Sequence, residues 1–117
     1  MVNSKVSSNL IYVSSPYTHS DSSVVENRMK CVTKYLAQLS AERKIAFSPL
    51  LMHYCFDCGV ELPKDYEFWR NHCLTLLSKS DVMHVLLLPG WDDSIGVKDE
   101  MDFALEHRIP FELINFN

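Results

Sequence analysis

Hydrophobic and polar residues follow two alternating patterns along this chain. Short, continuous apolar runs predict strands that are buried on both faces of a sheet, at residues 10–13, 45–47, 82–88 and 111–114. Between these runs, apolar residues recur every three or four positions and predict helices, over about residues 22–44, 64–79 and 95–108. Strands that alternate with helices in this way are typical of an α/β fold with a parallel sheet.

The element order predicts a three-layer, Rossmann-like or flavodoxin-like sandwich. Right-handed crossovers give a four- to five-stranded parallel sheet with strand order 2-1-3-4. The carboxyl ends of strands one and three are neighbours in this order, so the loops at residues 14–21 and 90–96 should form a ligand site together. Residues 50–63 show no clear period and predict an irregular excursion with at most one short helical turn. We expect residues 1–8 to be a flexible tail and residues 9–117 to be a single domain.

Residues 82–105 combine a buried strand, a tight loop and a helix. Pro89 and Gly90 end the strand, and Ser94 is a good N-cap for the helix. The helix is predicted from the spacing of its apolar positions, which are Val97, Met101, Ala104 and Leu105. Free N–H groups and the dipole at a helix start favour an anion such as phosphate. Glu100, one to two turns into this helix, is the candidate for chemistry.

Composition excludes several classes of function. A chain of 117 residues with 47% hydrophobic residues is long enough for one domain with a real core. Its formal charge of −4 argues against binding to a nucleic acid polymer, although a single nucleotide needs only a local pocket. The sequence shows no apolar signal core and no run long enough to span a membrane. We therefore expect a cytoplasmic protein whose four cysteines are thiols, with no metal or other cofactor.

Four segments carry a family resemblance. They are an I-Y-V strand with a hydroxyl-rich loop (Ile11–Tyr17), the pair Asn27-Arg28, a Phe-Trp helix leading to Ser-Asp-Val (Phe68–Val82), and P-G-W-x-x-S-x-G-V-x-x-E (Pro89–Glu100). Together they resemble the nucleoside 2-deoxyribosyltransferase superfamily, which includes the 2'-deoxynucleoside 5'-monophosphate N-glycosidases. The similarity is greatest to a small branch found in bacteria and their phages. It spans roughly residues 9–114, and its last segment is the most specific.

The resemblance implies a reaction. The glutamate of the last segment, Glu100, would attack C1' of a nucleotide or 2'-deoxynucleoside 5'-monophosphate and form a glycosyl-glutamate ester. Water would then complete a hydrolysis, or a second base would complete a deoxyribosyl transfer. Tyr12 would orient the nucleophile by a hydrogen bond. Arg28 would reach a phosphate, and Ser94 and Gly96 would bind phosphate or sugar.

Further contacts are expected from the two loops. The predicted substrate-binding residues of the loops also include Ser14, Tyr17, Gly90 and Trp91, with Trp91 as a lid or wall of the pocket. One position departs from the family pattern, because Cys73 stands where the family usually carries the aspartate that protonates the leaving base. Asp93, Asp92 or another acid would take over that role, or the base would leave without help.

Two other functions stay open. With Cys73 at the acid position, the protein could be a non-catalytic nucleotide sensor on the same scaffold. A structural zinc protein could use His53, Cys55 and Cys58, although a zinc site usually shows two ligand pairs. Whatever the function, we expect a homodimer or higher homo-oligomer, because a four-stranded sheet leaves edges and apolar faces to cover. The resemblance implies the same, since relatives build the pocket between subunits.

Overall fold

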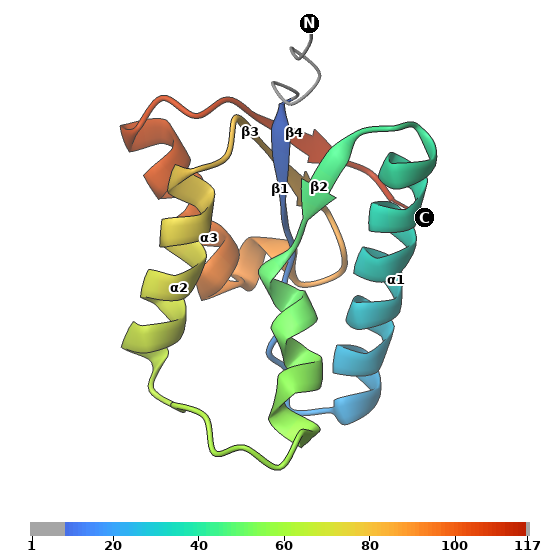
Figure 1. The fold of residues 1–117 in the computed structure, drawn as a ribbon, viewed down its shortest axis with the longest axis vertical. Coiled ribbons are helices and arrows are strands. Elements are labelled where there is room, and N and C mark those ends of the chain that lie inside the picture. The colour runs from blue at the N-terminus through green and yellow to red at the C-terminus, as the bar shows by residue number, and fades with distance from the viewer. Residues whose placement is uncertain (1–8, 117) are drawn as a thin grey trace, which may run out of the picture.

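The computed structural model describes residues 9–116, so the tail predicted at residues 1–8 lies outside the described residues (Figure 1). Its strands are β1 (Leu10–Ser14), β2 (Ile45–Phe47), β3 (Val82–Leu86) and β4 (Phe111–Ile114). Its α-helices are α1 (Ser22–Ala41), α2 (Tyr66–Ser78) and α3 (Ile95–Glu106). Two 3-10 helices, η2 (Pro49–Asp57) and η3 (Trp91–Asp93), complete the order. The predicted alternation of strands and helices is confirmed.

The sheet has four strands in the order β2-β1-β3-β4, as predicted. All three strand pairs are parallel, and the central pair aligns Ile11 with Val82 and Ser14 with Val85. The carboxyl ends of β1 and β3 are therefore neighbours at the position where the strand order reverses. This is the edge at which open α/β sheets bind ligands.

Helices cover both faces of the sheet and make three layers (Figure 1). Successive strand residues point to opposite faces, so one strand feeds two cores. Ile11 and Val13 pack with α1 in one core, while Tyr12 packs with residues of α2 and α3, such as Leu77 and Val97, in the other. The fold thus places every second residue of β1 opposite α3.

Three local predictions are wrong. The segment predicted to be irregular contains η2, a 3-10 helix of nine residues that Ser48 caps and Pro49 opens. The central strand ends at Leu86 rather than Leu88. On α3 the buried residues are Val97, Glu100 and Ala104, whereas Leu105 is 67% exposed.

The helices of the described residues do not combine the length and the apolar character that a membrane span requires.

Candidate active site

A cavity of about 980 Å³ opens at the carboxyl edge of the sheet. Its walls come from the β1–α1 loop, η2, α2, and the β3–α3 loop with the first turns of α3. Ligand pockets usually measure about 300–1,000 Å³, so this one has room for a nucleotide. The two loops that the sequence predicted to be neighbours both line it.

Glu100 lies at the bottom of this cavity. It belongs to the inward stripe of α3, where Val97, Glu100 and Ala104 are three and four residues apart. Only 8% of Glu100 is exposed, yet it lines the cavity. A buried carboxylate needs hydrogen-bond partners, and β1 supplies them.

Two side chains of β1 hold the carboxylate. The Tyr12 hydroxyl donates to Glu100 Oε2 at 2.9 Å, and the Ser14 hydroxyl donates to Oε1 at 2.6 Å. Tyr12 and Ser14 are two residues apart on a strand, so both point to the face that α3 covers. The carboxylate is thereby fixed in orientation through residues far apart in the sequence.

Burial raises the pKa of Glu100 from 4.5 to about 7, and the hydrogen bonds from Ser14 and Tyr12 oppose this rise. A substantial fraction of the side chain is therefore anionic at neutral pH and available as a nucleophile. Burial, together with the charge of Glu100, raises the pKa of Tyr12, so its hydroxyl stays a proton donor in the hydrogen bond.

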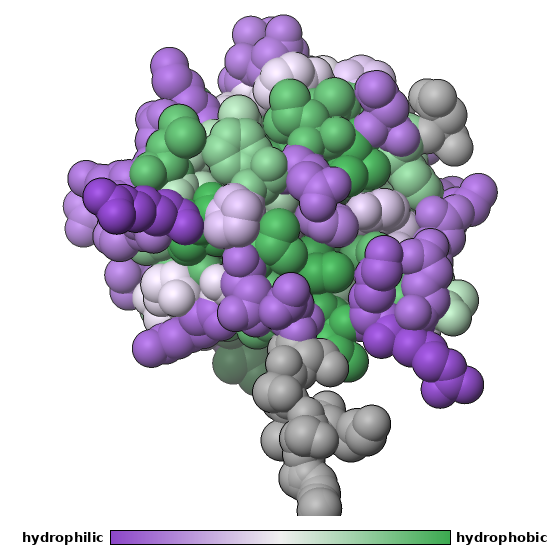
Figure 2. Space-filling model, turned by 90° about the horizontal axis from the view of Figure 1, so that it is seen from above, coloured by the Kyte–Doolittle hydropathy of each residue, from purple (hydrophilic) through white to green (hydrophobic). Residues whose placement is uncertain are grey.

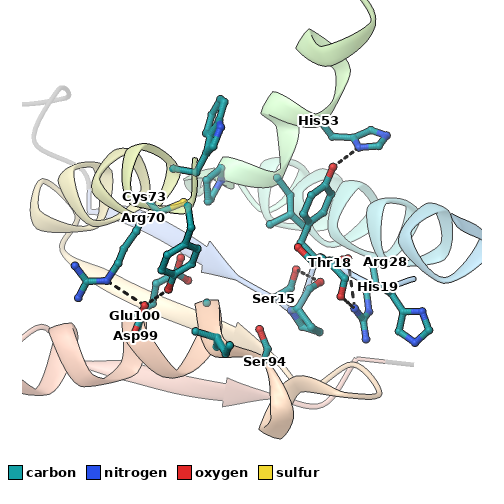
Figure 3. A pocket seen from close by; sticks show the side chains of 18 of the residues that line it. Ser15, Thr18, His19, Arg28, His53, Arg70, Cys73, Ser94, Asp99 and Glu100 are labelled. Carbon is teal, nitrogen blue, oxygen red and sulfur yellow. Dashed lines mark hydrogen bonds and ion pairs between the residues drawn. The ribbon is translucent and has the colours of Figure 1, made fainter. Parts of the chain in front are cut away.

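Cys73 of α2 lies beside this carboxylate (Figure 3). Burial, followed by the nearby charge of Glu100, raises the pKa of the Cys73 thiol to about 12. The thiol therefore keeps its proton at neutral pH. It also packs against the core that contains Leu77, in agreement with a half-buried side chain.

The start of α3 has the features expected of an anion site. The Ser94 hydroxyl accepts a hydrogen bond from the Val97 N–H at 3.2 Å and caps the helix. The first turn of a helix leaves N–H groups without helical partners. Ser94 and Gly96 line the cavity, as do Gly90 and Asp93 of the preceding loop. These four predicted residues therefore lie in one place, at the edge of the cavity.

Arg28 lines the cavity, and other parts of the protein engage its guanidinium. Its guanidinium donates to the carbonyl oxygens of Tyr17, Thr18 and Pro89, at 3.3, 3.0 and 2.9 Å. Only 7% of the residue is exposed. These bonds tie the β1–α1 loop to the β3–α3 loop, so the side chain is not free to grip a phosphate with both terminal nitrogens. A Cβ at Gly90 would lie 2.6 Å from Arg28 Nη2, so the fit at this contact favours glycine.

Two of the predicted residues are not among the described residues that line the cavity. Trp91 packs against the core on the α3 side. Ser14 is fully buried behind Glu100 and orients the carboxylate rather than facing the cavity. The direction of each side chain depends on the backbone of its loop or strand, and the sequence motif does not specify that direction.

Tyr17 lines the cavity as predicted, and it has a partner in η2. Its hydroxyl is 2.5 Å from Nδ1 of His53, so this contact joins the β1–α1 loop to η2. Within residues 9–116, no group of three or more His, Cys, Asp or Glu side chains could hold a metal ion. In the part of the chain that the structure describes, His53, Cys55 and Cys58 therefore do not form a zinc site.

Sequence reasoning missed a polar cluster between α2 and α3. The hydroxyl of Tyr66 donates to Asp99 Oδ2, and Arg70 Nε donates to the same oxygen at 3.0 Å. Figure 3 shows Arg70 and Asp99 beside Cys73 and Glu100. Tyr66, Arg70 and Cys73 are four and three residues apart, and this helical spacing was the signal that could have revealed the cluster.

Comparison with known proteins agrees with this fold. The chain has the fold of a 2-deoxyribosyltransferase: a solved structure of that enzyme, from the psychrotolerant bacterium Bacillus psychrosaccharolyticus, matches with a TM-score of 0.64. The two share 20% sequence identity, over 89% of this chain and 70% of the other. A family model, described as a domain of unknown function (DUF1937), matches residues 9–115, and the chain belongs to this family. No curated protein sequence matches the chain.

Proposed function

We propose that the protein cleaves or transfers the N-glycosidic bond of a nucleotide or 2'-deoxynucleoside 5'-monophosphate, with Glu100 as the nucleophile. The observation that carries this proposal is the buried Glu100 carboxylate, held by Tyr12 and Ser14 at the bottom of the cavity. The fold shared with a 2-deoxyribosyltransferase supports the same class of reaction.

The reaction has two steps. In the first, a carboxylate oxygen of Glu100 attacks C1' of the sugar, and the C1'–N bond breaks to give a glycosyl-glutamate ester. In the second, water hydrolyses the ester, or a second base takes up the sugar. Tyr12 and Ser14 keep the carboxylate in one orientation, which lowers the entropic cost of reaching the attacking geometry.

We propose that the phosphate of the substrate binds at the start of α3. Ser94 and Gly96 line the cavity there, and the unpaired N–H groups of the first helical turn favour an anion. Arg70 and Lys64 add positive side chains to the cavity wall. A 5'-monophosphate bound at this edge would put its sugar over Glu100.

The experiment is base release from a panel of nucleosides and 5'-monophosphates, followed by chromatography. The wild-type protein is expected to release free base from at least one of them. Glu100→Gln keeps the size of the side chain but removes the nucleophile, so release should fall by at least about 10³-fold, as when other enzymes lose a catalytic group that acts as nucleophile. Glu26→Gln, on the exposed face of α1, is the matched control and should keep the wild-type rate. A folded wild type that releases no base from the whole panel contradicts the proposal.

A non-catalytic nucleotide sensor is the second candidate, and the Cys73 thiol favours it. A thiol whose pKa is raised to about 12 is a poor proton donor for a leaving base at neutral pH. Thermal unfolding with and without each nucleotide tests this candidate. A higher unfolding temperature without any release of base would favour the sensor over the enzyme.

We also propose a homo-oligomer. Large apolar side chains are exposed at the two edges of the sheet, with Ile45 of β2 54% exposed and Leu113 of β4 48% exposed. Figure 2 shows apolar patches that reach the surface between polar side chains on the face seen from above. Exposed apolar groups on sheet edges favour pairing with another copy. Sedimentation at increasing protein concentration tests this proposal, and a monomer at every concentration would contradict it.

A further inference from the structure

The proton donors around Glu100 limit which bases can leave. A neutral purine or pyrimidine leaves C1' as an anion unless an acid protonates it, and such general acid catalysis is typically worth about 10²–10⁴-fold. A base that already carries a positive charge on the ring leaves as a neutral molecule and needs no proton. The groups near the carboxylate therefore indicate which kind of substrate the site suits.

Among residues 9–116, no carboxylic acid donates a hydrogen bond to the Glu100 carboxylate. The Tyr12 and Ser14 hydroxyls already donate to the carboxylate. The Cys73 thiol is the third donor there, and burial raises its pKa to about 12. Near neutral pH these three groups have no readily transferable proton for a departing base.

The other carboxylates of the cavity wall are either engaged in hydrogen bonds or exposed. Oδ2 of Asp99 accepts hydrogen bonds from Tyr66 and Arg70, which fix the side chain between α2 and α3. Asp93 belongs to η3, in the exposed turn before α3. Arg70 offsets the charge of Asp99, whereas Asp93 adds a negative charge at the exposed side of the cavity wall, and such charge favours a positively charged base.

Aromatic side chains form much of the remaining wall. Phe56 of η2 and Trp69 of α2 both line the cavity, with ring centroids 5.4 Å apart. Tyr17 and Tyr66 add two more rings. The face of an aromatic ring attracts a cation within about 6 Å, and it also stacks on a flat heterocycle. The wall thus has the chemistry to hold a flat, positively charged base.

We infer that the substrate is a nucleotide whose base is a positively charged heteroaromatic ring, such as a pyridinium or an N7-alkylated purine. This inference rests on the proposed function, since it concerns the same site and the same nucleophile. A Glu100 oxygen forms the bond to C1', the C1'–N bond breaks, and its electron pair neutralises the ring. Water then hydrolyses the ester, releases the sugar phosphate and regenerates the Glu100 carboxylate with one proton lost to solvent.

The test compares leaving groups of matched size. Wild-type protein is incubated with 7-methylguanosine 5'-monophosphate, guanosine 5'-monophosphate and nicotinamide mononucleotide, each with ribose and with 2-deoxyribose, and free base is measured by chromatography. We expect kcat/KM for the methylated guanine nucleotide to exceed that of its neutral counterpart by at least about 100-fold, the lower end of the contribution of a general acid. The nicotinamide nucleotide should behave like the methylated one.

A variant separates the missing acid from the intrinsic reactivity of a charged base. Cys73→Asp places a carboxyl group beside Glu100, so it should speed release of neutral guanine by at least about 10-fold and leave release of 7-methylguanine little changed. Cys58→Asp is the matched control, because Cys58 is exposed and lies outside the described wall of the cavity. If Cys73→Asp does not fold, each wild-type rate is divided by the spontaneous release rate of the same nucleotide, and a rate acceleration as large for guanine as for 7-methylguanine overturns the inference.

The outcomes are distinct. Equal or faster release of neutral bases, abolished in Glu100→Gln, would overturn this inference and leave the proposed function standing. If a folded wild type released no base from any of these nucleotides or from the wider panel, the proposed function would fail, and this inference would fail with it.

Discussion

Glu100 occupies a position that helix patterning assigns to a hydrophobic residue. It shares the inward stripe of α3 with Val97 and Ala104, and its carboxylate is buried against β1. Burial of a carboxylate is unfavourable unless hydrogen bonds compensate, and here Tyr12 and Ser14 compensate in part. A polar group placed at such cost to stability is typical of functional sites.

The pH dependence of activity is the prediction at this scale. Because burial raises the pKa of Glu100 to about 7, kcat/KM for base release should rise as pH increases up to about 7 and then level off. Ser14→Ala removes a hydrogen bond that lowers this pKa, so it should move the midpoint of the profile to higher pH. The profile is corrected for the second ionisation of the substrate's phosphate, whose pKa is about 6. A rate that falls as pH rises toward 7 would contradict the role of the anion.

The residues of the site differ in how far the sequence could predict them. One strand–loop–helix segment predicts the positions of Ser94, Gly96 and Glu100. A helix start has the same geometry in any fold of this kind. Arg28 could not be predicted, because its partners are carbonyl oxygens from two loops. Backbone carbonyls leave no signal in a sequence, so the side chain looked available for a phosphate.

At the scale of elements, the site depends on how two loops and a 3-10 helix are held together. The strands and α-helices could be predicted because their apolar residues have clear periods. The apolar residues of η2 have no period of 3.6, and Ser48-Pro49 at its start also fits the end of a strand. An N-cap followed by proline at the first helical position is in fact a helix-start signal. The irregular apolar pattern of the residues that follow hides this signal.

At this scale we predict that the hydrogen bonds of Arg28 stabilise the fold. Arg28→Met keeps an apolar stem of similar length but removes the three hydrogen bonds to loop carbonyls, so the free energy of unfolding should fall by about 3 kcal/mol. Lys30→Met is the matched control on the exposed face of the same helix, with an expected change within about 0.5 kcal/mol. Both values come from urea denaturation. Equal effects of the two substitutions would show that Arg28 does not tie the loops together.

At the scale of the whole molecule, the buried carboxylate of the site reduces the stability of the fold. The sheet order and the two cores follow from alternation and right-handed crossovers, which is why the sequence could predict the architecture. The same architecture buries Glu100, and burial raises its pKa above the unfolded value of 4.5. Between that value and about 7, the folded state therefore binds more protons than the unfolded state.

Stability should therefore fall as pH rises through this window. The contribution of Glu100 amounts to about 3 kcal/mol lost between the unfolded pKa and the folded pKa. Glu100→Gln removes this contribution, so the variant should gain stability relative to the wild type at pH 8 and much less at pH 5. Thermal unfolding at both values measures the difference, with Glu26→Gln as the exposed control. A gain that is the same at both pH values would contradict the raised pKa.

The central claim is that the sugar becomes covalently attached to Glu100 during the reaction. The measurement is mass spectrometry of peptides from protein that is quenched in acid during turnover of a 5'-monophosphate. The account predicts a glycosyl adduct on the peptide that contains Glu100, absent from Glu100→Gln. Release of base by Glu100→Gln at the wild-type rate, with no adduct on the wild type, would contradict it.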